Sequence, residues 1–185
     1  MTKQLIFISG ASGSGKTYQA NQLLKEYGTK NCSVLGLDSY LHTREKRTEL
    51  GVYHGYNLLS YQYGKLQKDL FTLINKGEPI EVNAYQHGGG FADKEIIEPK
   101  DILIIEGVIS LYDEVFNRYK NLGKSIFIKI PDALLHSIKV TVDVQRGLLK
   151  KYSIEDIMET ANHYVAGYLE FCKPSMKNAS TIIER

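Results

Sequence analysis

Several features that reveal a protein's surroundings are missing from this chain. No apolar stretch approaches the roughly 20 residues that a membrane-spanning helix requires, and the apolar run near the N-terminus ends at Ser9 and Gly10, too early for a secretory signal peptide. The two cysteines, Cys32 and Cys172, are far apart and outside any metal-binding spacing. We expect both to be buried free thiols. These absences predict a soluble, cytoplasmic protein.

The chain also lacks an excess of charge. Its formal net charge is +2, too small to indicate a nucleic-acid partner or an anionic membrane surface. It contains no internal repeats, low-complexity tracts or linkers. A length of 185 residues with 43% apolar residues is sufficient for one globular domain with its own core. We therefore expect a single domain over residues 1–185; the oligomeric state, a homo-oligomer included, stays open.

Short apolar runs alternate with helical patterns along the chain, which is typical of an α/β protein with a mostly parallel sheet. We predict strands at 5–8, 33–37, 101–105, 126–130 and 181–183. Helices are predicted at 16–27, around 66–76, near 111–121, and over most of 132–173 with a break at 147–153. Residues 39–62 are predicted to be mostly loop. Two short strands at 79–85 and 95–98 predict a β-hairpin.

The strongest motif is Gly-Ala-Ser-Gly-Ser-Gly-Lys-Thr at residues 10–17, a full match to the P-loop pattern GxxxxGK[ST]. Glycines let consecutive backbone N–H groups turn toward phosphate oxygens, and the following helix adds its positive dipole end. Lys16 is predicted to bridge the β- and γ-phosphates of ATP, and the Thr17 hydroxyl to ligate Mg²⁺. The predicted nucleotide contacts are Gly10, Ser12, Gly13, Ser14, Gly15, Lys16 and Thr17. A predicted strand before the motif and a helix after it favour this interpretation over a chance glycine-rich turn.

Two carboxylates follow two other predicted strands. Ligands of open α/β sheets bind beyond the carboxyl ends of the strands, and Asp38 and Glu106 both stand at such ends. Asp38 is a candidate general base for an attacking hydroxyl, or else a turn or helix cap. Glu106 is a candidate Mg²⁺ ligand, directly or through water, or else simply a polar strand end. Together with Lys16 and Thr17 these residues predict one catalytic edge of the sheet.

With these residues, the chain resembles the uridine kinase and phosphoribulokinase-like branch of the P-loop kinases over nearly its whole length. The resemblance rests on the P-loop at 10–17, Leu37-Asp38-Ser39-Tyr40, the hairpin at 79–85, Ile105-Glu106-Gly107-Val108, Gln145-Arg146-Gly147 and the segment 171–183. It implies a three-layer sandwich around a five-stranded sheet, with a hairpin insertion at about 79–98 and a helical lid at about 139–153. It also implies transfer of the ATP γ-phosphate to a hydroxyl of a nucleoside-like molecule, with Asp38 as the base and Glu106 serving Mg²⁺.

The lid and the acceptor region depart from that family. The family's lid is rich in arginine, whereas residues 134–149 offer only Lys139 and Arg146, so Arg146 is the predicted lid cation. The predicted acceptor contacts are Asp38, Tyr40, Tyr56, Asn57, Tyr85 and His87. Asn57 takes the place of the family's sugar-binding aspartate, and His87 stands near a base-reading histidine that this chain lacks. The tyrosines are candidates for stacking on a base, although tyrosines in loops also serve as packing residues.

Arg44 to Arg47 are expected to be exposed charge, with a role toward an ATP or acceptor phosphate as the alternative. Three functional classes stay open. The first is a kinase of a nucleoside or of another small alcohol, such as a vitamin precursor or sugar phosphate. The second is a nucleotide-hydrolysing switch without an acceptor; a guanine-reading NKxD is lacking, since Asn75-Lys76-Gly77-Glu78 has no aspartate. The third is a degenerate family member that binds ATP without turnover.

Overall fold

The computed structural model describes residues 2, 4–86 and 90–185. Its centre is a sheet of five strands in the order β2-β5-β1-β6-β7, and every neighbouring pair is parallel. The strands are β1 (Gln4–Gly10), β2 (Cys32–Gly36), β5 (Ile102–Glu106), β6 (Gly123–Lys129) and β7 (Thr181–Glu184). The predicted five-stranded parallel sheet is confirmed. Central strands such as β1 are apolar without alternation because both of their faces are covered.

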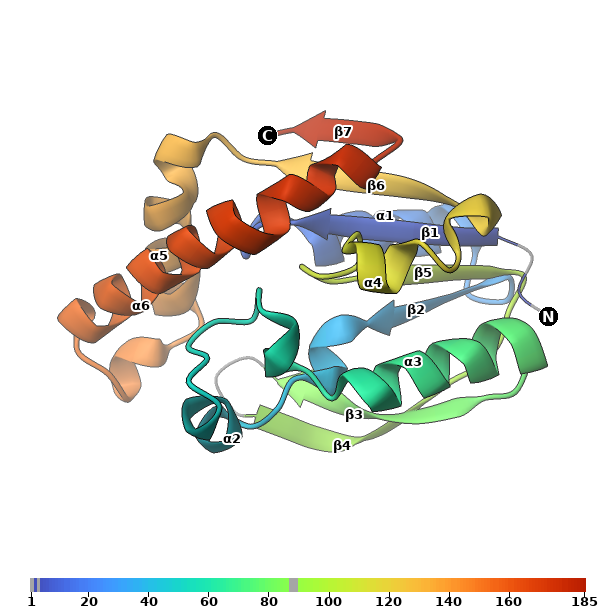
Figure 1. Ribbon diagram of the computed structural model, residues 1–185, viewed down its shortest axis with the longest axis horizontal. Helices are drawn as coiled ribbons and strands as arrows, with labels where there is room; N and C mark the ends of the chain where they lie inside the picture. The colour runs from blue at the N-terminus through green and yellow to red at the C-terminus, as the bar shows by residue number, and fades with distance from the viewer. Residues whose placement is uncertain (1, 3, 87–89) are drawn as a thin grey trace.

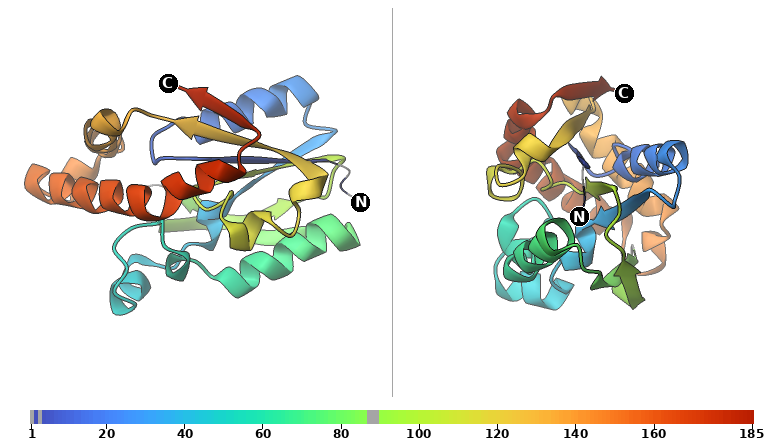
Figure 2. Two further views of the ribbon diagram at one scale, coloured as in Figure 1. Left: turned by 45° about the horizontal axis from the view of Figure 1, so that its top comes forward. Right: turned by 90° about the vertical axis from the view of Figure 1, so that its right-hand side faces the viewer.

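Helices cover both faces of this sheet, as expected for a three-layer sandwich (Figure 2). The helices are α1 (Lys16–Tyr27), α2 (Arg44–Glu49), α3 (Tyr63–Phe71), α4 (Asp113–Phe116), α5 (Leu135–Gln145) and α6 (Ile154–Gly167). Helix α1 packs its Ala20 against Ile6 and Ile8 on one face. On the other face, α3 and α4 pack against a larger core around Phe7 and Leu103. Both predicted free cysteines are buried, and Cys172 belongs to this larger core.

The carboxyl ends of the parallel strands all lie at one edge, at the left in Figure 1. Helices α2, α5 and α6 extend beyond that edge. The predicted hairpin is present as β3 (Ile80–Gln86) paired antiparallel with β4 (Gly90–Ile97), in a small sheet of its own. Strand β3 lies against the 3₁₀ turn η1 (Leu37–Tyr40), which follows β2. These elements are therefore placed to surround whatever binds at the carboxyl edge.

The expectation of a mostly irregular segment at 39–62 was only partly right. Residues Arg44–Glu49 form α2, capped by Thr43, whose hydroxyl accepts the Lys46 N–H at 3.3 Å. A short 3₁₀ turn, Leu58–Ser60, follows. The helix predicted near 111–121 is also shorter than expected, because α4 ends at Phe116 and a 3₁₀ turn at Lys120–Leu122 leads into β6. In the part of the chain described here, no helix is both long and apolar enough to cross a membrane.

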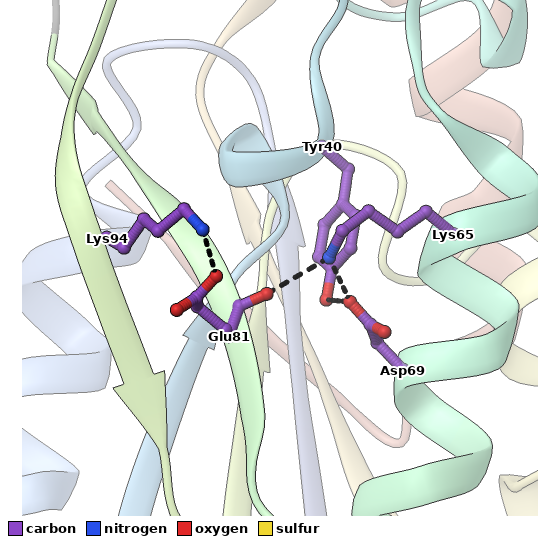
Figure 3. Close-up of polar contacts among 5 residues, drawn as sticks. All are labelled: Tyr40, Lys65, Asp69, Glu81 and Lys94. Atoms are coloured by element: carbon purple, nitrogen blue, oxygen red, sulfur yellow. Dashed lines mark hydrogen bonds and ion pairs between the residues drawn. The ribbon is translucent and has the colours of Figure 1, made fainter.

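A polar network that begins at the buried Tyr40 and Asp69 and ends at the surface of the hairpin fixes the hairpin and α3 against η1 (Figure 3). Tyr40 of η1 donates its hydroxyl hydrogen to Asp69 of α3 at 3.0 Å, and Lys65 pairs with the same carboxylate at 2.5 Å. Lys65 also donates to the backbone carbonyl of Glu81 on β3 at 3.1 Å, while Lys94 of β4 pairs with the Glu81 side chain. Helix α3 and both strands of the hairpin are thereby tied to η1, the turn that carries Asp38.

Candidate active site

The P-loop connects β1 to α1 with the backbone shape that its glycines permit. Gly10 has φ +144°, and a Cβ atom there would lie 2.4 Å from the carbonyl oxygen of Ile128 on the neighbouring strand. Gly13 has φ +80°, in the left-handed region that favours glycine. Lys16 is buried and donates from Nζ to the Ala11 carbonyl at 2.8 Å, so its charge lies over its own loop. This is a compact turn at a helix N-terminus, which suits phosphate oxygens.

Glu106 lies beside the P-loop because of strand register. It pairs with Ile8 of β1 and with Gly36 of β2 at the end of β5, and its Oε1 accepts a hydrogen bond from the Thr17 hydroxyl at 3.1 Å. Burial raises the pKa of the Glu106 carboxyl; Lys16 lowers it, the negative charge of Asp38 raises it, and the Thr17 hydroxyl lowers it. A hydroxyl and a carboxylate oxygen side by side are donors that Mg²⁺ prefers.

Asp38 completes this edge from η1. It lines a cavity of about 700 Å³ together with Ser12 of the P-loop, and its charge contributes to raising the pKa values of Glu106 and Tyr85. The predicted meeting of Lys16, Thr17, Asp38 and Glu106 at the carboxyl ends of neighbouring strands is therefore present in the structure. Their individual catalytic roles stay predictions.

The cavity extends from the P-loop toward the elements beyond the sheet. Its walls come from η1, helix α2, the loop after α2, strand β3 of the hairpin, and the facing helices α5 and α6. It is partly open to solvent, and both tyrosine rings and charged groups line it. A space of this size, directly beside a P-loop, can hold a small organic molecule next to a bound triphosphate.

Comparison with known proteins identifies the relationship. The family model described as the phosphoribulokinase / uridine kinase family matches residues 5–185. The chain belongs to this family. Uridine kinase from Ureaplasma parvum is 29% identical over 97% of this chain and 86% of its own length. Phosphoribulokinase from Synechocystis sp. is 26% identical over 97% of this chain and 53% of its own length.

The structural comparison agrees at the level of the fold. Phosphoribulokinase from Rhodobacter spheroides superposes with a TM-score of 0.66 and 14% identity, covering 99% of this chain and 70% of the other. The chain is thus a P-loop kinase of a family that uses ATP and acts on small substrates. None of these similarities determines the acceptor, since the family includes both nucleoside and sugar-phosphate kinases by name.

Besides Asp38, three of the residues predicted to contact the acceptor or the transferred phosphate line the cavity: Tyr56, Tyr85 and Arg146. Tyr56 is 2% exposed, and its hydroxyl accepts the Ser12 N–H of the P-loop at 2.7 Å. Burial raises the pKa of Tyr85 to about 12, with Asp38 adding to the effect. Arg146 caps the C-terminus of α5 at the cavity wall. His87 lies outside the described residues.

Two other residues predicted to contact the acceptor, Tyr40 and Asn57, do not line the cavity in this structure. Tyr40 is fully buried, does not line the cavity, and uses its hydroxyl to bind Asp69. It packs η1 onto α3 instead of contacting a ligand. Asn57 also lies outside the cavity wall, and its amide oxygen accepts the Leu59 N–H at 2.9 Å as the cap of a 3₁₀ turn. The role of Asn57 in place of the family's sugar-binding aspartate stays a prediction.

The lid region offers less free charge than the sequence suggests. Lys139 forms a buried ion pair with Asp143 one turn later on α5, and its ammonium group lies 4.2 Å from the centre of the Tyr164 ring. Burial lowers the pKa of Lys139, with the Asp143 hydrogen bond opposing that shift. Lys139 is therefore neutralised within the α5–α6 wall. The role of Arg146 as the lid cation stays a prediction.

Arg44 to Arg47 were predicted to be exposed charge, and Arg44 is exposed, whereas Arg47 is only partly exposed. Both residues line the cavity from α2. Their spacing of three residues puts them on one face of a helix, which is a signal that could have been used had α2 been recognised. Tyr152 and Tyr164, from the facing lid region, also line the cavity and were not singled out.

Proposed function

We propose that this chain transfers the γ-phosphate of ATP to a hydroxyl of a small alcohol bound in the cavity. The observation that supports this most directly is the position of Asp38. Its carboxylate lines the same cavity as Ser12 of the P-loop, and its charge acts on Glu106 beside Thr17. A base, a phosphate cradle and a space for an acceptor are thus adjacent.

Each group has a part in phosphoryl transfer. The backbone N–H groups of residues 10–17 and the Lys16 ammonium hold the phosphates and offset their charge. Asp38 accepts the proton of the acceptor hydroxyl as that oxygen attacks the γ-phosphorus. Arg146 stabilises the charge that develops on the transferred group. Catalysis then rests on positioning and electrostatics.

Thr17 and Glu106 are the residues that fit a Mg²⁺ ion. Their oxygens are already in contact at 3.1 Å, and both are hard donors. The described residues contain no cluster of three histidine, cysteine or acidic side chains that would form a closed metal cage; this agrees with a metal shared between one or two protein oxygens and substrate phosphates. Bound there, Mg²⁺ would neutralise charge on the β- and γ-phosphate oxygens.

The residues that line the cavity narrow the chemical class of the acceptor. Tyr85 and the other lining tyrosines support a planar, nucleoside-like group as predicted. The loss of Asn57 and Tyr40 from the wall weakens the case for uridine itself. The two arginines of α2 favour a second candidate, a charged acceptor such as a sugar phosphate or a vitamin precursor that carries a carboxylate.

The test is the Asp38→Ala variant. We expect phosphate transfer to fall by about 10²-fold or more, the usual range for loss of a general base, while ATP still binds, because the P-loop is unchanged. Acceptor-dependent ADP formation measures the first quantity, and titration with a fluorescent ATP analogue measures the second. Glu26→Ala, at an exposed carboxylate on α1, is the control and should behave as the parent protein.

Near-normal transfer by Asp38→Ala would exclude Asp38 as the base. Steady ATP hydrolysis that no acceptor stimulates would instead support a nucleotide-hydrolysing protein without an acceptor. Tight ATP binding with no turnover would support a degenerate kinase, the class suggested by the arginine-poor lid.

A further inference from the structure

Arg185, directly after β7, lies against the backbone of the P-loop. Its backbone N–H donates to the Lys129 carbonyl at 3.1 Å, which ties the residue to the end of β6. A Cβ atom on Gly15 would overlap Nη1 of Arg185. The guanidinium group can take this place because Gly15 has no side chain. The edge of the sheet thus delivers a cation onto the loop that is built to hold phosphates.

Two residues of α1 orient this guanidinium group. Nη2 of Arg185 donates to Oε1 of Gln19 at 3.3 Å, and the guanidinium carbon lies 5.4 Å from the centre of the Tyr18 ring. The Tyr18 ring is 60% exposed, so it packs little of the core. A guanidinium group has five N–H donors, and Gln19 is the one acceptor that the described residues offer to them. Arg185 is therefore positioned and still has donors for a ligand.

The charge of Arg185 is not compensated within the described part of the chain. Lys129, at the end of β6, is paired with Glu184 at 2.8 Å. No aspartate or glutamate side chain among residues 2, 4–86 and 90–185 forms an ion pair with Arg185. Helix α1 has no acidic residue in its first turn and no side-chain cap. A helix N-terminus disfavours a neighbouring cation, so the arrangement indicates an anion that Arg185 and the start of α1 share.

The strand order indicates which phosphate of ATP lies on this side. In the order β2-β5-β1-β6-β7, Asp38 and Glu106 follow strands on one side of β1, and Arg185 follows the strand at the other edge (Figure 1). With the γ-phosphate directed to Asp38, the rest of the nucleotide runs toward β6 and β7. A P-loop holds the α- and β-phosphates on its backbone N–H groups. The anion nearest Arg185 is then the α-phosphate.

We propose that Arg185 binds the α-phosphate of ATP, with Tyr18 and Gln19 as its positioning residues. The inference rests on the proposed function, which supplies the direction of the nucleotide. A planar guanidinium fork can bind two phosphate oxygens at once. Since Lys139 of the lid region is already paired with Asp143, Arg185 adds a cation to the nucleotide that α5 does not supply.

The nucleobase is the other group that could contact Arg185, because guanidinium groups also stack on aromatic rings. The position of Arg185 favours the phosphate. The base lies a whole ribose beyond the α-phosphate, whereas Arg185 contacts the phosphate loop itself at Gly15. The Tyr18 ring also covers the guanidinium group already.

The first experiment measures binding by titration calorimetry, in the presence of Mg²⁺, for three ligands: a non-hydrolysable ATP analogue, ADP and inorganic triphosphate. We expect Arg185→Gln to raise the Kd of all three by about tenfold. That is the low end of the range for a charged hydrogen bond, because the guanidinium group is exposed to solvent. Arg118→Gln, at an exposed arginine in the segment before β6, is the matched control and should bind all three as the parent does.

Each ligand excludes one alternative. ADP lacks the γ-phosphate, so a loss with the ATP analogue but not with ADP would assign Arg185 to the γ-phosphate and overturn the proposal. Inorganic triphosphate lacks the base, so a loss confined to the two nucleotides would assign Arg185 to the base and overturn it as well. Unchanged binding of all three ligands by Arg185→Gln, or no binding of triphosphate to the parent, would also overturn it. Unfolding of Arg185→Gln without ligand should match that of the parent, which excludes a folding defect.

The second experiment tests the positioning role of Tyr18 with ADP as the ligand. Tyr18→Phe keeps the ring and should bind as the parent does. Tyr18→Ala should raise the Kd by about 2- to 5-fold, the effect of an exposed cation–π contact. In a protein that already carries Arg185→Gln, Tyr18→Ala should change nothing further. An equal loss in both backgrounds would show that the ring does not act through Arg185.

These measurements separate the inference from the proposed function. Calorimetry needs neither an acceptor nor turnover, so unchanged binding by Arg185→Gln would remove the α-phosphate contact and leave phosphate transfer to be decided by Asp38→Ala. Conversely, near-normal transfer by Asp38→Ala would remove the base, while the three ligands would still report whether Arg185 contacts the α-phosphate. Under turnover, Arg185→Gln should raise the KM for ATP by about tenfold, with kcat and the KM for the acceptor within about twofold.

Discussion

The two halves of this site are built in different ways. The nucleotide half consists of eight consecutive residues, 10–17, with Glu106 supplied by an adjacent strand in register. Its donors are largely backbone N–H groups, whose position depends on glycine conformation. The acceptor half is assembled from side chains of η1, α2, β3, α5 and α6. These elements span more than a hundred residues of sequence.

This difference separates the binding of the nucleotide from the choice of acceptor. A backbone cradle binds any triphosphate, because amide groups are the same in every sequence. A wall of side chains can change one residue at a time without disturbing the sheet. We therefore expect substitutions in the nucleotide half to affect every acceptor equally, and substitutions in the acceptor half to discriminate between acceptors.

The largest effect that would test this contrast is expected from Lys16→Ala. Lys16 is the one side-chain cation within the P-loop, and its loss removes a point charge from the phosphates. We expect transfer to fall by about 10²- to 10³-fold, the range for removal of one preorganised stabilising group, and ATP binding to weaken as well. ADP formation with at least two acceptors should fall by the same factor.

A suitable control is Lys46→Ala, at an exposed lysine on the outer face of α2. Its rate should match that of the parent protein. If Lys16→Ala reduced transfer to one acceptor far more than to another, the proposed division between the two halves would be wrong.

A smaller effect, about 10- to 100-fold, is expected from Glu106→Gln, because the amide keeps the size of the side chain but is a poorer partner for Mg²⁺. The loss should be partly recovered at higher Mg²⁺ concentration. Glu98→Gln, at an exposed glutamate after β4, is the matched control. If the activity of Glu106→Gln depended on Mg²⁺ concentration in the same way as that of the parent, the metal role of Glu106 would be contradicted.

The stability of the folded protein should also depend on pH through the Glu106 carboxyl. Burial raises its pKa above the ordinary value of 4.5, so the folded protein keeps this proton at a pH where the unfolded chain has lost it. Stability then falls as pH rises from about 4.5 through the folded-state pKa. Glu106→Gln removes this pH-dependent contribution to stability. Without Mg²⁺, the variant's advantage in Tm over the parent should grow with pH across that window and then level off.

The same contrast explains how far the sequence could be interpreted. Lys16, Thr17, Asp38 and Glu106 could be placed because each follows a predicted parallel strand, and such strand ends share one edge. The hairpin and the five strands could also be predicted, because the apolar pattern of each strand is local. The sequence did not show that α2 faces the segment before α6, because the contact of Arg44 with Tyr152 depends on tertiary packing between residues about 110 positions apart.

The errors fall in one segment, where local pattern was weak. Residues 39–62 have no clear periodicity, so α2 was not recognised. Tyr40 was assigned as an aromatic residue that could stack on a base, and Asn57 was assigned by resemblance. In the structure Tyr40 is bound to Asp69, a partner 29 residues away, and Asn57 caps its own turn. A polar or aromatic residue in such a loop can satisfy its hydrogen bonds within the protein. Sequence cannot show which residues do so.

The smallest expected effect concerns Tyr56, which joins the two halves. Its hydroxyl accepts the Ser12 N–H at 2.7 Å, a group that a bound phosphate would also use. Tyr56→Phe should destabilise the free protein by about 0.5–1.5 kcal/mol, since the part-buried Ser12 N–H loses its hydrogen bond. ATP no longer has to displace that bond, so it should bind the variant as tightly as the parent or more tightly.

Thermal unfolding without ATP measures the loss of stability, and thermal unfolding with ATP measures how tightly the nucleotide binds. Tyr53→Phe, at a ring that is 61% exposed, is the control. Equal stability of Tyr56→Phe and the parent, or weaker ATP binding by the variant, would show that the hydroxyl does not compete with the nucleotide for the P-loop.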